Sequence, residues 1–184
     1  MSVVMPRFLD VEASSLNKES YPIEIAWSDA LGNIQSSLIN PYSVDVWVDW
    51  DFYAQHKIHG ISRQMCREQG IHPKDMCRLM SDSVRPGEII YADGGEFDEN
   101  WVDVLFGAGT TRGFAQFRVV HSDEVMLPFL MKIEPDDSKK RDLIYSELKD
   151  KARKIVKTQH RAVVDVQYLI ELWKLCVCIE KMMF

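Results

Sequence analysis

The chain has 184 residues, of which 46% are hydrophobic and 27% are charged, and this composition excludes a disordered or low-complexity protein. Its length suits one well-buried domain, so we expect residues 1–184 to form a single domain. The formal net charge of −6 excludes a protein that binds nucleic acid through an overall positive surface, so any such contact must be local.

The cysteines and the apolar segments indicate the compartment. Cys66, Cys77, Cys176 and Cys178 form no pair with the spacing of a zinc site, which favours free thiols in a reducing compartment. The first residues lack a signal-peptide pattern, and charged residues interrupt the apolar stretch from 163 to 184. We therefore expect a cytoplasmic protein without a membrane partner.

Three short strands are predicted at the start of the chain. They cover Arg7–Glu12, Ile23–Ser28 and Ile34–Ile39, each with apolar residues typical of a strand. The segment Asp29–Asn33 has the composition of a tight turn, and residues 13–22 leave no room for a crossover helix. Both connections therefore predict an antiparallel meander.

Strands and helices alternate after this meander. One helix should start after Ser62 as its N-cap and end near Gly70, and another should run from Pro73 towards Val84. A fourth strand is predicted at Glu88–Asp93, a helix at Phe97–Phe106, and a fifth strand at Phe114–Val120.

The remaining residues should be helical, with two apolar stripes. The first stripe contains Leu143, Ile144, Leu148, Ala152, Ile155 and Val156. The second contains Val163, Val166, Leu169, Ile170, Trp173 and Val177. This order of elements predicts an α/β fold, with a mixed five-stranded sheet and helices packed on both of its faces.

Candidate functional side chains occur in three acidic motifs that lie far apart in the sequence. Asp10 and Glu12 point to the same face of the first strand, where a divalent cation would offset the cost of burying two carboxylates. Asp98 falls in the first turn of a helix, and His160 precedes Asp165 at the start of the last helix. Each of these has a structural alternative, namely a solvated strand end, a charge that complements the helix dipole, and a structural histidine.

Taken together, these motifs resemble those of the DEDDh exonucleases. The matching residues are Asp10-x-Glu12, Phe97-Asp98 and His160-x4-Asp165, together with Tyr21–Ile25 and His59-Gly60-Ile61. The superfamily includes ribonuclease T, oligoribonuclease and the proofreading subunit of the bacterial replicative polymerase. The resemblance covers nearly the whole chain and implies a ribonuclease H-like fold. The chain departs from the family at Ala13-Ser14-Ser15, where Thr-Thr-Gly or Ala-Thr-Gly is frequent, and at Gly94, where many members have Asn.

The resemblance also implies roles for individual residues. Two divalent ions, Mg²⁺ or Mn²⁺, would be held by four carboxylates, those of Asp10, Glu12, Asp98 and Asp165. His160 would be the general base, since an imidazole can accept a proton from water near neutral pH. The 3′ end of the substrate would meet Ala13, Leu16, His59 and Ile61. For Leu16 and Ile61, packing in the core is the alternative.

The predicted activity is therefore that of a metal-dependent 3′→5′ exonuclease, which releases nucleoside 5′-monophosphates from single-stranded DNA or RNA. The alternative is a non-catalytic module of the same fold that binds nucleic acid or a protein. A basic run from Lys149 to Lys157 precedes His160 and could guide phosphates or form a solvated helix face. The aromatic residues at 47–53 could stack on bases, although packing in the core or in a homodimer is the interpretation we favour.

Overall fold

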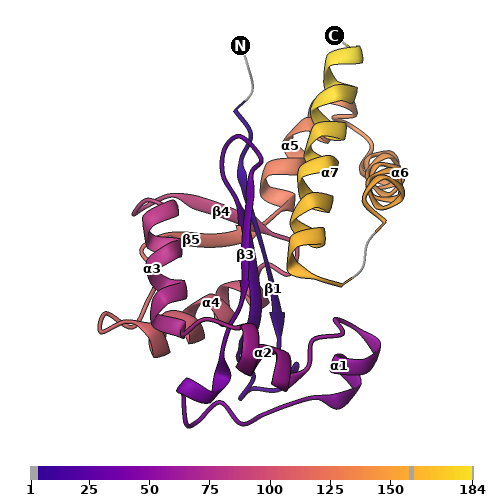
Figure 1. Ribbon diagram of the computed structural model, residues 1–184. Coiled ribbons are helices and arrows are strands. Elements are labelled where there is room, and N and C mark those ends of the chain that lie inside the picture. The colour runs from indigo at the N-terminus through magenta and orange to yellow at the C-terminus, as the bar shows by residue number, and fades with distance from the viewer. Residues whose placement is uncertain (1–3, 158–159, 184) are drawn as a thin grey trace.

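A computed structural model describes residues 4–157 and 160–183. Its centre is a five-stranded sheet with the strand order β3-β2-β1-β4-β5 (Figure 1). The strands are β1 (Arg7–Ala13), β2 (Pro22–Ser28), β3 (Ile34–Leu38), β4 (Ile89–Ala92) and β5 (Arg118–His121). The predicted mixed sheet with its ribonuclease H-like topology is confirmed.

The first strand of the chain is the middle strand of the sheet. β1 pairs with β2 in an antiparallel manner, with Glu12 opposite Glu24, and β2 pairs with β3 in the same way. On its other edge β1 is parallel to β4, which is parallel to β5. The predicted meander is therefore present, and two parallel strands extend it.

Helices cover both faces of this sheet. They are η1 (Pro41–Ser43), α1 (Phe52–Lys57), α2 (Arg63–Gln69), α3 (Pro73–Ser83), α4 (Glu96–Gly109), α5 (Asp123–Ile133), α6 (Ser138–Val156) and α7 (Ala162–Met183). In Figure 1, α3 and α4 lie on one side of the sheet, and α5, α6 and α7 lie on the other. Each side has its own cluster of buried apolar residues. The predicted second stripe is confirmed, because five of its side chains on α7 are buried, namely Val166, Leu169, Ile170, Trp173 and Val177.

The alternation of β1 sets the location of the acidic side chains. Leu9 and Val11 belong to the core shared with α3 and α4, whereas Phe8 belongs to the core shared with α7. Since side chains two residues apart share a face, Asp10 and Glu12 follow Phe8 towards α7. The strand therefore presents its two carboxylates to the last helix of the chain.

The predicted fifth strand begins too early. The expectation of a strand over Phe114–Val120 is wrong for its first four residues, because β5 begins at Arg118. The ladder starts where Ile89 pairs with Arg118, and the turn at Pro86-Gly87 removes any partner strand before that point. Phe114 is consequently exposed, and Phe117 is buried outside the strand.

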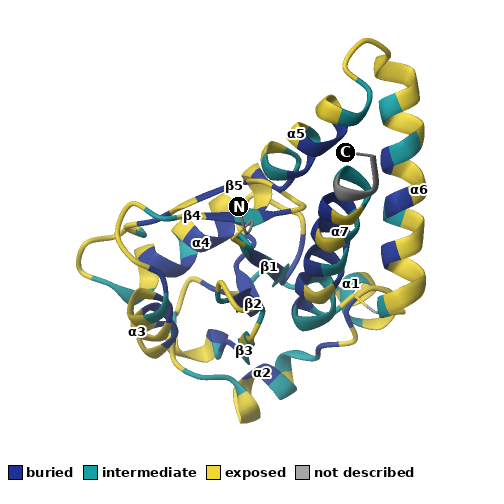
Figure 2. Ribbon diagram, turned by 90° about the horizontal axis from the view of Figure 1, so that it is seen from above, coloured by how far each residue is buried: buried dark blue, intermediate teal, exposed yellow. Residues whose placement is uncertain are grey.

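The first predicted helical stripe is only partly correct. Leu143 and Ile155 are exposed, and the residues of α6 that are buried are Tyr145, Leu148 and Ala152. Figure 2 shows the reason, since α6 lies at the outer edge of the molecule and turns only one narrow face inwards. No helix was predicted at α1, which begins at Phe52 near the end of the aromatic segment 47–53 and is capped by Asp51.

All four cysteines are free thiols, and three of them, Cys66, Cys77 and Cys176, are buried. In the described ranges 4–157 and 160–183, no helix combines the length and the apolar character needed to cross a membrane.

Candidate active site

Three carboxylates converge between β1 and α7. One oxygen each of Asp10, Glu12 and Asp165 lie within 4.8 Å of one another, and all three residues are partly buried. Asp10 and Glu12 come from the central strand, and Asp165 comes from the first turn of α7. The fold therefore joins the first and the third predicted acidic motifs, although about 150 residues of sequence separate them.

A buried ion pair fixes the beginning of α7 against the sheet. Arg161 donates from Nε and Nη2 to the two oxygens of Glu24, at 2.9 and 2.6 Å. The backbone N–H of Ala162 donates to the same carboxylate at 3.1 Å, so Glu24 also caps the first turn of the helix. Because Glu24 is the β2 residue opposite Glu12, this clamp holds α7 beside the carboxylates of β1.

Asp98 is placed by the turn between β4 and α4. It is 2% exposed, and its Oδ2 accepts a hydrogen bond of 3.0 Å from the N–H of Gly94. A Cβ at position 94 would lie 2.6 Å from the same oxygen, so the glycine makes this close approach feasible. In this arrangement Asp98 lies near Asp10 without joining the group of three whose oxygens lie within 4.8 Å. The second motif thus borders the site formed by the other two.

Burial and mutual repulsion raise the pKa values of four carboxyl groups in this region, those of Asp10, Glu12, Asp98 and Asp165. Burial followed by the charges of Asp165 and Glu24 raises the pKa of Glu12 to about 8, and burial raises that of Asp165 to about 6. Burial also raises the pKa of Asp98 to about 7, against the backbone N–H groups that favour its charged form. Burial, with Asp98 and Glu12 nearby, raises the pKa of Asp10 well above its usual value.

These shifts show that the carboxylates fit a divalent cation. Burial outweighs the charge of Arg161 near Glu12 and that of His160 near Asp165, so a cation within the cluster would favour the ionised forms of these carboxyl groups. Oxygen ligands from Asp and Glu are those that Mg²⁺ and Mn²⁺ prefer. The donor set of Asp10, Glu12 and Asp165 can therefore hold such an ion, and the charge of Asp98 also acts on Asp10.

The carboxylates open into a cavity of about 400 Å³. Besides the three carboxylates, the residues that line it are Val11, Asp93, Gly94, Arg153, His160 and Tyr168. His160 is exposed and lies at the mouth of this cavity, immediately before the Glu24–Arg161 clamp. Residues 158 and 159, which precede it, are outside the described ranges. The predicted base therefore shares one cavity with the predicted metal ligands.

The predicted substrate-binding residues differ in exposure. Leu16, in the loop after β1, is 84% exposed and is available to a ligand. Ile61 is fully buried in the core, as its alternative interpretation predicted, and the side chains of Ala13 and His59 are buried as well. Among the predicted substrate-binding residues, Leu16 is therefore the exposed one.

Several residues around the cavity were not identified from the sequence. Arg153 belongs to the basic run, but nothing in the pattern separates it from its neighbours. Tyr168 lies one helical turn after Asp165, and this spacing was the available signal. Glu24 lies within Tyr21–Ile25, the stretch of the second strand that resembles the DEDDh exonucleases. Its ion pair with Arg161 could not be predicted, because the two residues are 137 positions apart.

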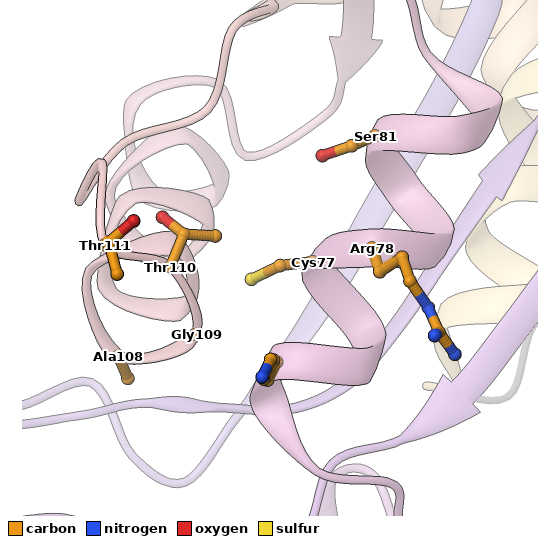
Figure 3. Close-up of a pocket in the computed structure, with 8 residues that line it drawn as sticks. Cys77, Arg78, Ser81, Ala108, Gly109, Thr110 and Thr111 are labelled. Atoms are coloured by element: carbon orange, nitrogen blue, oxygen red, sulfur yellow. The ribbon is translucent and has the colours of Figure 1, made fainter.

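A larger concavity of about 540 Å³ lies between α3 and the end of α4 (Figure 3). Lys74, Cys77, Arg78 and Ser81 line one side of it, and residues 108–111 line the other. It shares no lining residue with the carboxylate cavity, and no carboxylate is among the described residues that line it. Burial raises the pKa of the Cys77 thiol to about 12, which makes it a poor nucleophile. The acidic cavity is therefore the better candidate for catalysis.

Solved structures of exonucleases resemble this fold. Exonuclease I of E. coli in complex with a 5cy-dT13 oligonucleotide superimposes with a TM-score of 0.62 at 17% identity, covering 98% of this chain and 42% of the other. Exonuclease I of Methylocaldum szegediense gives a TM-score of 0.60 at 16% identity, covering 90% of this chain and 39% of the other. This chain thus spans about two fifths of the length of those proteins.

A third solved structure with this fold is a ribonuclease domain. The RNase domain of the yeast Pop2 protein gives a TM-score of 0.55 at 13% identity, covering 92% of this chain and 76% of the other. The sequence matches no protein-family model and no curated protein. The chain thus has the fold of these nucleases, as the resemblance of its acidic motifs to the DEDDh exonucleases predicted.

Proposed function

We propose that the chain is a metal-dependent 3′→5′ exonuclease that acts on single-stranded DNA or RNA. The observation that carries this proposal is the convergence of Asp10, Glu12 and Asp165 to within 4.8 Å in a cavity that His160 also lines. The fold shared with Exonuclease I and the Pop2 RNase domain supports it. A carboxylate cluster beside a histidine is suited to the hydrolysis of a phosphodiester.

Each residue has a part in the proposed reaction. Asp10, Glu12, Asp98 and Asp165 would hold two divalent ions, Mg²⁺ or Mn²⁺. When bound, these ions supply Lewis acidity to the attacking water and to the phosphoryl oxygens. His160 takes a proton from that water, whose oxygen forms a bond to phosphorus. The bond from phosphorus to the 3′-oxygen breaks, and the 3′-oxygen takes up a proton to leave a shortened strand and a nucleoside 5′-monophosphate.

The 3′ end would be recognised at the side of the cavity beyond β1. Leu16 offers an exposed apolar side chain that can pack against the terminal base. Ala13, His59 and Ile61 are buried, so within the predicted set we assign the contact with the 3′ end to Leu16. The residues described do not distinguish the 2′-hydroxyl of RNA from its absence in DNA.

Hydrolysis of matched RNA and DNA strands tests the proposal. Ten-nucleotide strands labelled at the 5′ end should shorten one nucleotide at a time in Mn²⁺ or Mg²⁺, release nucleoside 5′-monophosphates and remain intact in EDTA. Asp10→Asn should abolish hydrolysis, whereas Glu147→Gln, an equal change at an exposed position on α6, should not. A protein that binds the strands but never shortens them would establish the non-catalytic alternative, and shortening from the labelled end would contradict the proposed direction.

A further inference from the structure

One residue of the basic run differs from the others in its location. Arg153 is on α6, yet it lines the carboxylate cavity together with residues of β1 and α7. Its guanidinium lies 5.6 Å from the centre of the Tyr168 ring. Its one described ion pair, with Asp150 at 3.4 Å, is exposed and therefore weak. The guanidinium is held at the cavity wall without a strong internal partner.

Tyr168 is the second unusual residue on this wall. It is 5% exposed, and its buried hydroxyl has no hydrogen-bond partner among the residues that the structure describes. A buried hydroxyl without a partner is destabilising, so such groups are usually satisfied by something outside the chain when they are retained. Tyr168 lies three residues after Asp165 on α7, which places the two side chains on neighbouring positions of the same helix face.

These two residues together suit a phosphate group. A guanidinium and a neutral O–H are both donors, and phosphate oxygens accept from both. They stand on the wall of a cavity whose other walls carry carboxylates, so an anion enters only where a cation bridges it to those carboxylates. The group that meets both conditions is the phosphate that is to be cleaved.

We infer that Arg153 and Tyr168 form a phosphate-binding pair that donates hydrogen bonds to a non-bridging oxygen of the scissile phosphate. This inference rests on the proposed exonuclease function and assigns to that site a donor pair outside its acidic motifs. Negative charge on that phosphate grows towards the transition state, so the Arg153 guanidinium should favour the transition state over the bound substrate. Lys151 and Lys154 on the same helix are exposed and do not line the cavity.

A substrate with one phosphate isolates this contact. The p-nitrophenyl ester of thymidine 5′-monophosphate lacks the upstream strand, and its hydrolysis in Mn²⁺ can be followed by absorbance. Arg153→Ala should lower kcat by about 10²–10³-fold, and Tyr168→Phe should lower it by roughly tenfold. Lys154→Ala and Lys151→Ala remove the same charge from α6 and should change kcat less than about twofold.

A binding measurement keeps the test independent of turnover. Thymidine 5′-monophosphate should bind the wild-type chain in Mn²⁺ and bind Arg153→Ala at least about tenfold more weakly, with Lys154→Ala as the matched control. Arg153→Lys keeps the charge without the planar fork and should recover part of the loss, which also covers the case that Arg153→Ala fails to fold.

The outcomes separate the two proposals. A wild-type chain that never hydrolyses the ester or a strand in Mn²⁺ overturns the proposed function. A wild-type chain that hydrolyses both, with Arg153→Ala equal to Lys154→Ala in kcat and in nucleotide affinity, leaves the proposed function intact and overturns the phosphate-binding pair. Equal activity of Tyr168→Phe and the wild type removes Tyr168 from the pair.

Discussion

At the scale of single residues, the cavity combines groups that differ sharply in exposure. Asp98 is almost completely buried, whereas His160 is exposed at the mouth of the cavity. A buried carboxylate can be held in place for a metal ion, and an exposed imidazole can exchange a proton with solvent after each turnover. This division is consistent with separate tasks for the carboxylates and the histidine.

Replacement of the histidine tests that division. Because His160 contributes a proton-accepting group and is not among the clustered carboxylates, His160→Ala should lower kcat by about 10²–10⁴-fold. Stabilisation of the fold by Mn²⁺, measured by thermal unfolding, should be unchanged in this variant. His56→Ala, which removes an exposed histidine that does not line the cavity, is the matched control. Near-normal turnover of His160→Ala would rule out a general-base role.

The raised pKa values of the carboxyl groups predict how stability depends on pH. In the folded protein the pKa is about 8 for Glu12, about 7 for Asp98 and about 6 for Asp165. At a pH between the ordinary carboxyl pKa and these values, the folded metal-free protein binds more protons than the unfolded chain. Stability therefore falls as the pH rises through this window. In EDTA we expect a melting temperature several degrees lower at about pH 8 than at about pH 5.

A variant shows whether the carboxyl cluster causes this dependence. Glu12→Gln removes one of the groups with a raised pKa, so its metal-free melting temperature should vary less across the same pH range. Glu147→Gln, on the exposed face of α6, should retain the wild-type slope. A metal-free protein that becomes more stable as the pH rises would contradict the described arrangement of the carboxyl groups.

At the scale of elements, the position of α7 decides whether the site exists. Asp165 is carried to β1 by the first turn of this helix, and Glu24 of β2 anchors that turn through the Arg161 guanidinium and the Ala162 N–H. The anchor bonds the sheet directly to the helix. The geometry of the ligand set therefore depends on a residue that is not itself a ligand.

Loss of this anchor should affect stability and activity together. Glu24→Gln leaves a guanidinium without its charged partner and should lower the free energy of unfolding by about 1–3 kcal/mol. Affinity for Mn²⁺ should fall too, because the first turn of α7 loses its fixed position. Glu171→Gln removes an exposed ion pair with Lys174 from the same helix and should cost less than about 0.5 kcal/mol. Wild-type Mn²⁺ affinity in Glu24→Gln would show that the clamp does not position Asp165.

The sequence predicted most elements because their local signals were strong. The Ser62 cap, the Pro73 start and the turn at Asp29–Asn33 all lie where local chemistry places them. The missed α1 is a helix of six residues with no buried side chain, so no apolar stripe marks it. The errors at Phe114 and Leu143 share one cause, which is that an apolar residue was expected to be buried where the fold supplies no neighbour.

The acidic motifs were predictable by their order, but their surroundings were not. Asp10 and Glu12 can be identified from the sequence because two carboxylates at the end of an apolar strand are unusual. The clamp at Glu24 and the placement of Arg153 and Tyr168 depend on contacts between distant parts of the chain, which no local pattern encodes. The close approach of Asp98 to Gly94 likewise became visible only in three dimensions.

At the scale of the whole molecule, a bound metal ion should stabilise the folded state. The metal-free site opposes folding at neutral pH, so an ion that binds only the folded protein should raise its stability markedly. We expect millimolar Mn²⁺ or Mg²⁺ to raise the melting temperature by roughly 5–10 °C relative to EDTA. Asp10→Asn should abolish this rise, and Glu147→Gln should preserve it. The absence of any rise, with full activity in chelator, would exclude a metal-dependent site.

The placement of β1 in the middle of the sheet has a consequence for synthesis of the chain. Its carboxylates are made before β4, which flanks β1, and well before α7, which supplies Asp165. A nascent chain that has not yet reached residue 165 therefore carries half of a metal site and cannot assemble the other half by local folding. Because the carboxylate cluster is complete only when α7 packs against β1, metal binding at this site would begin only after that helix has been made.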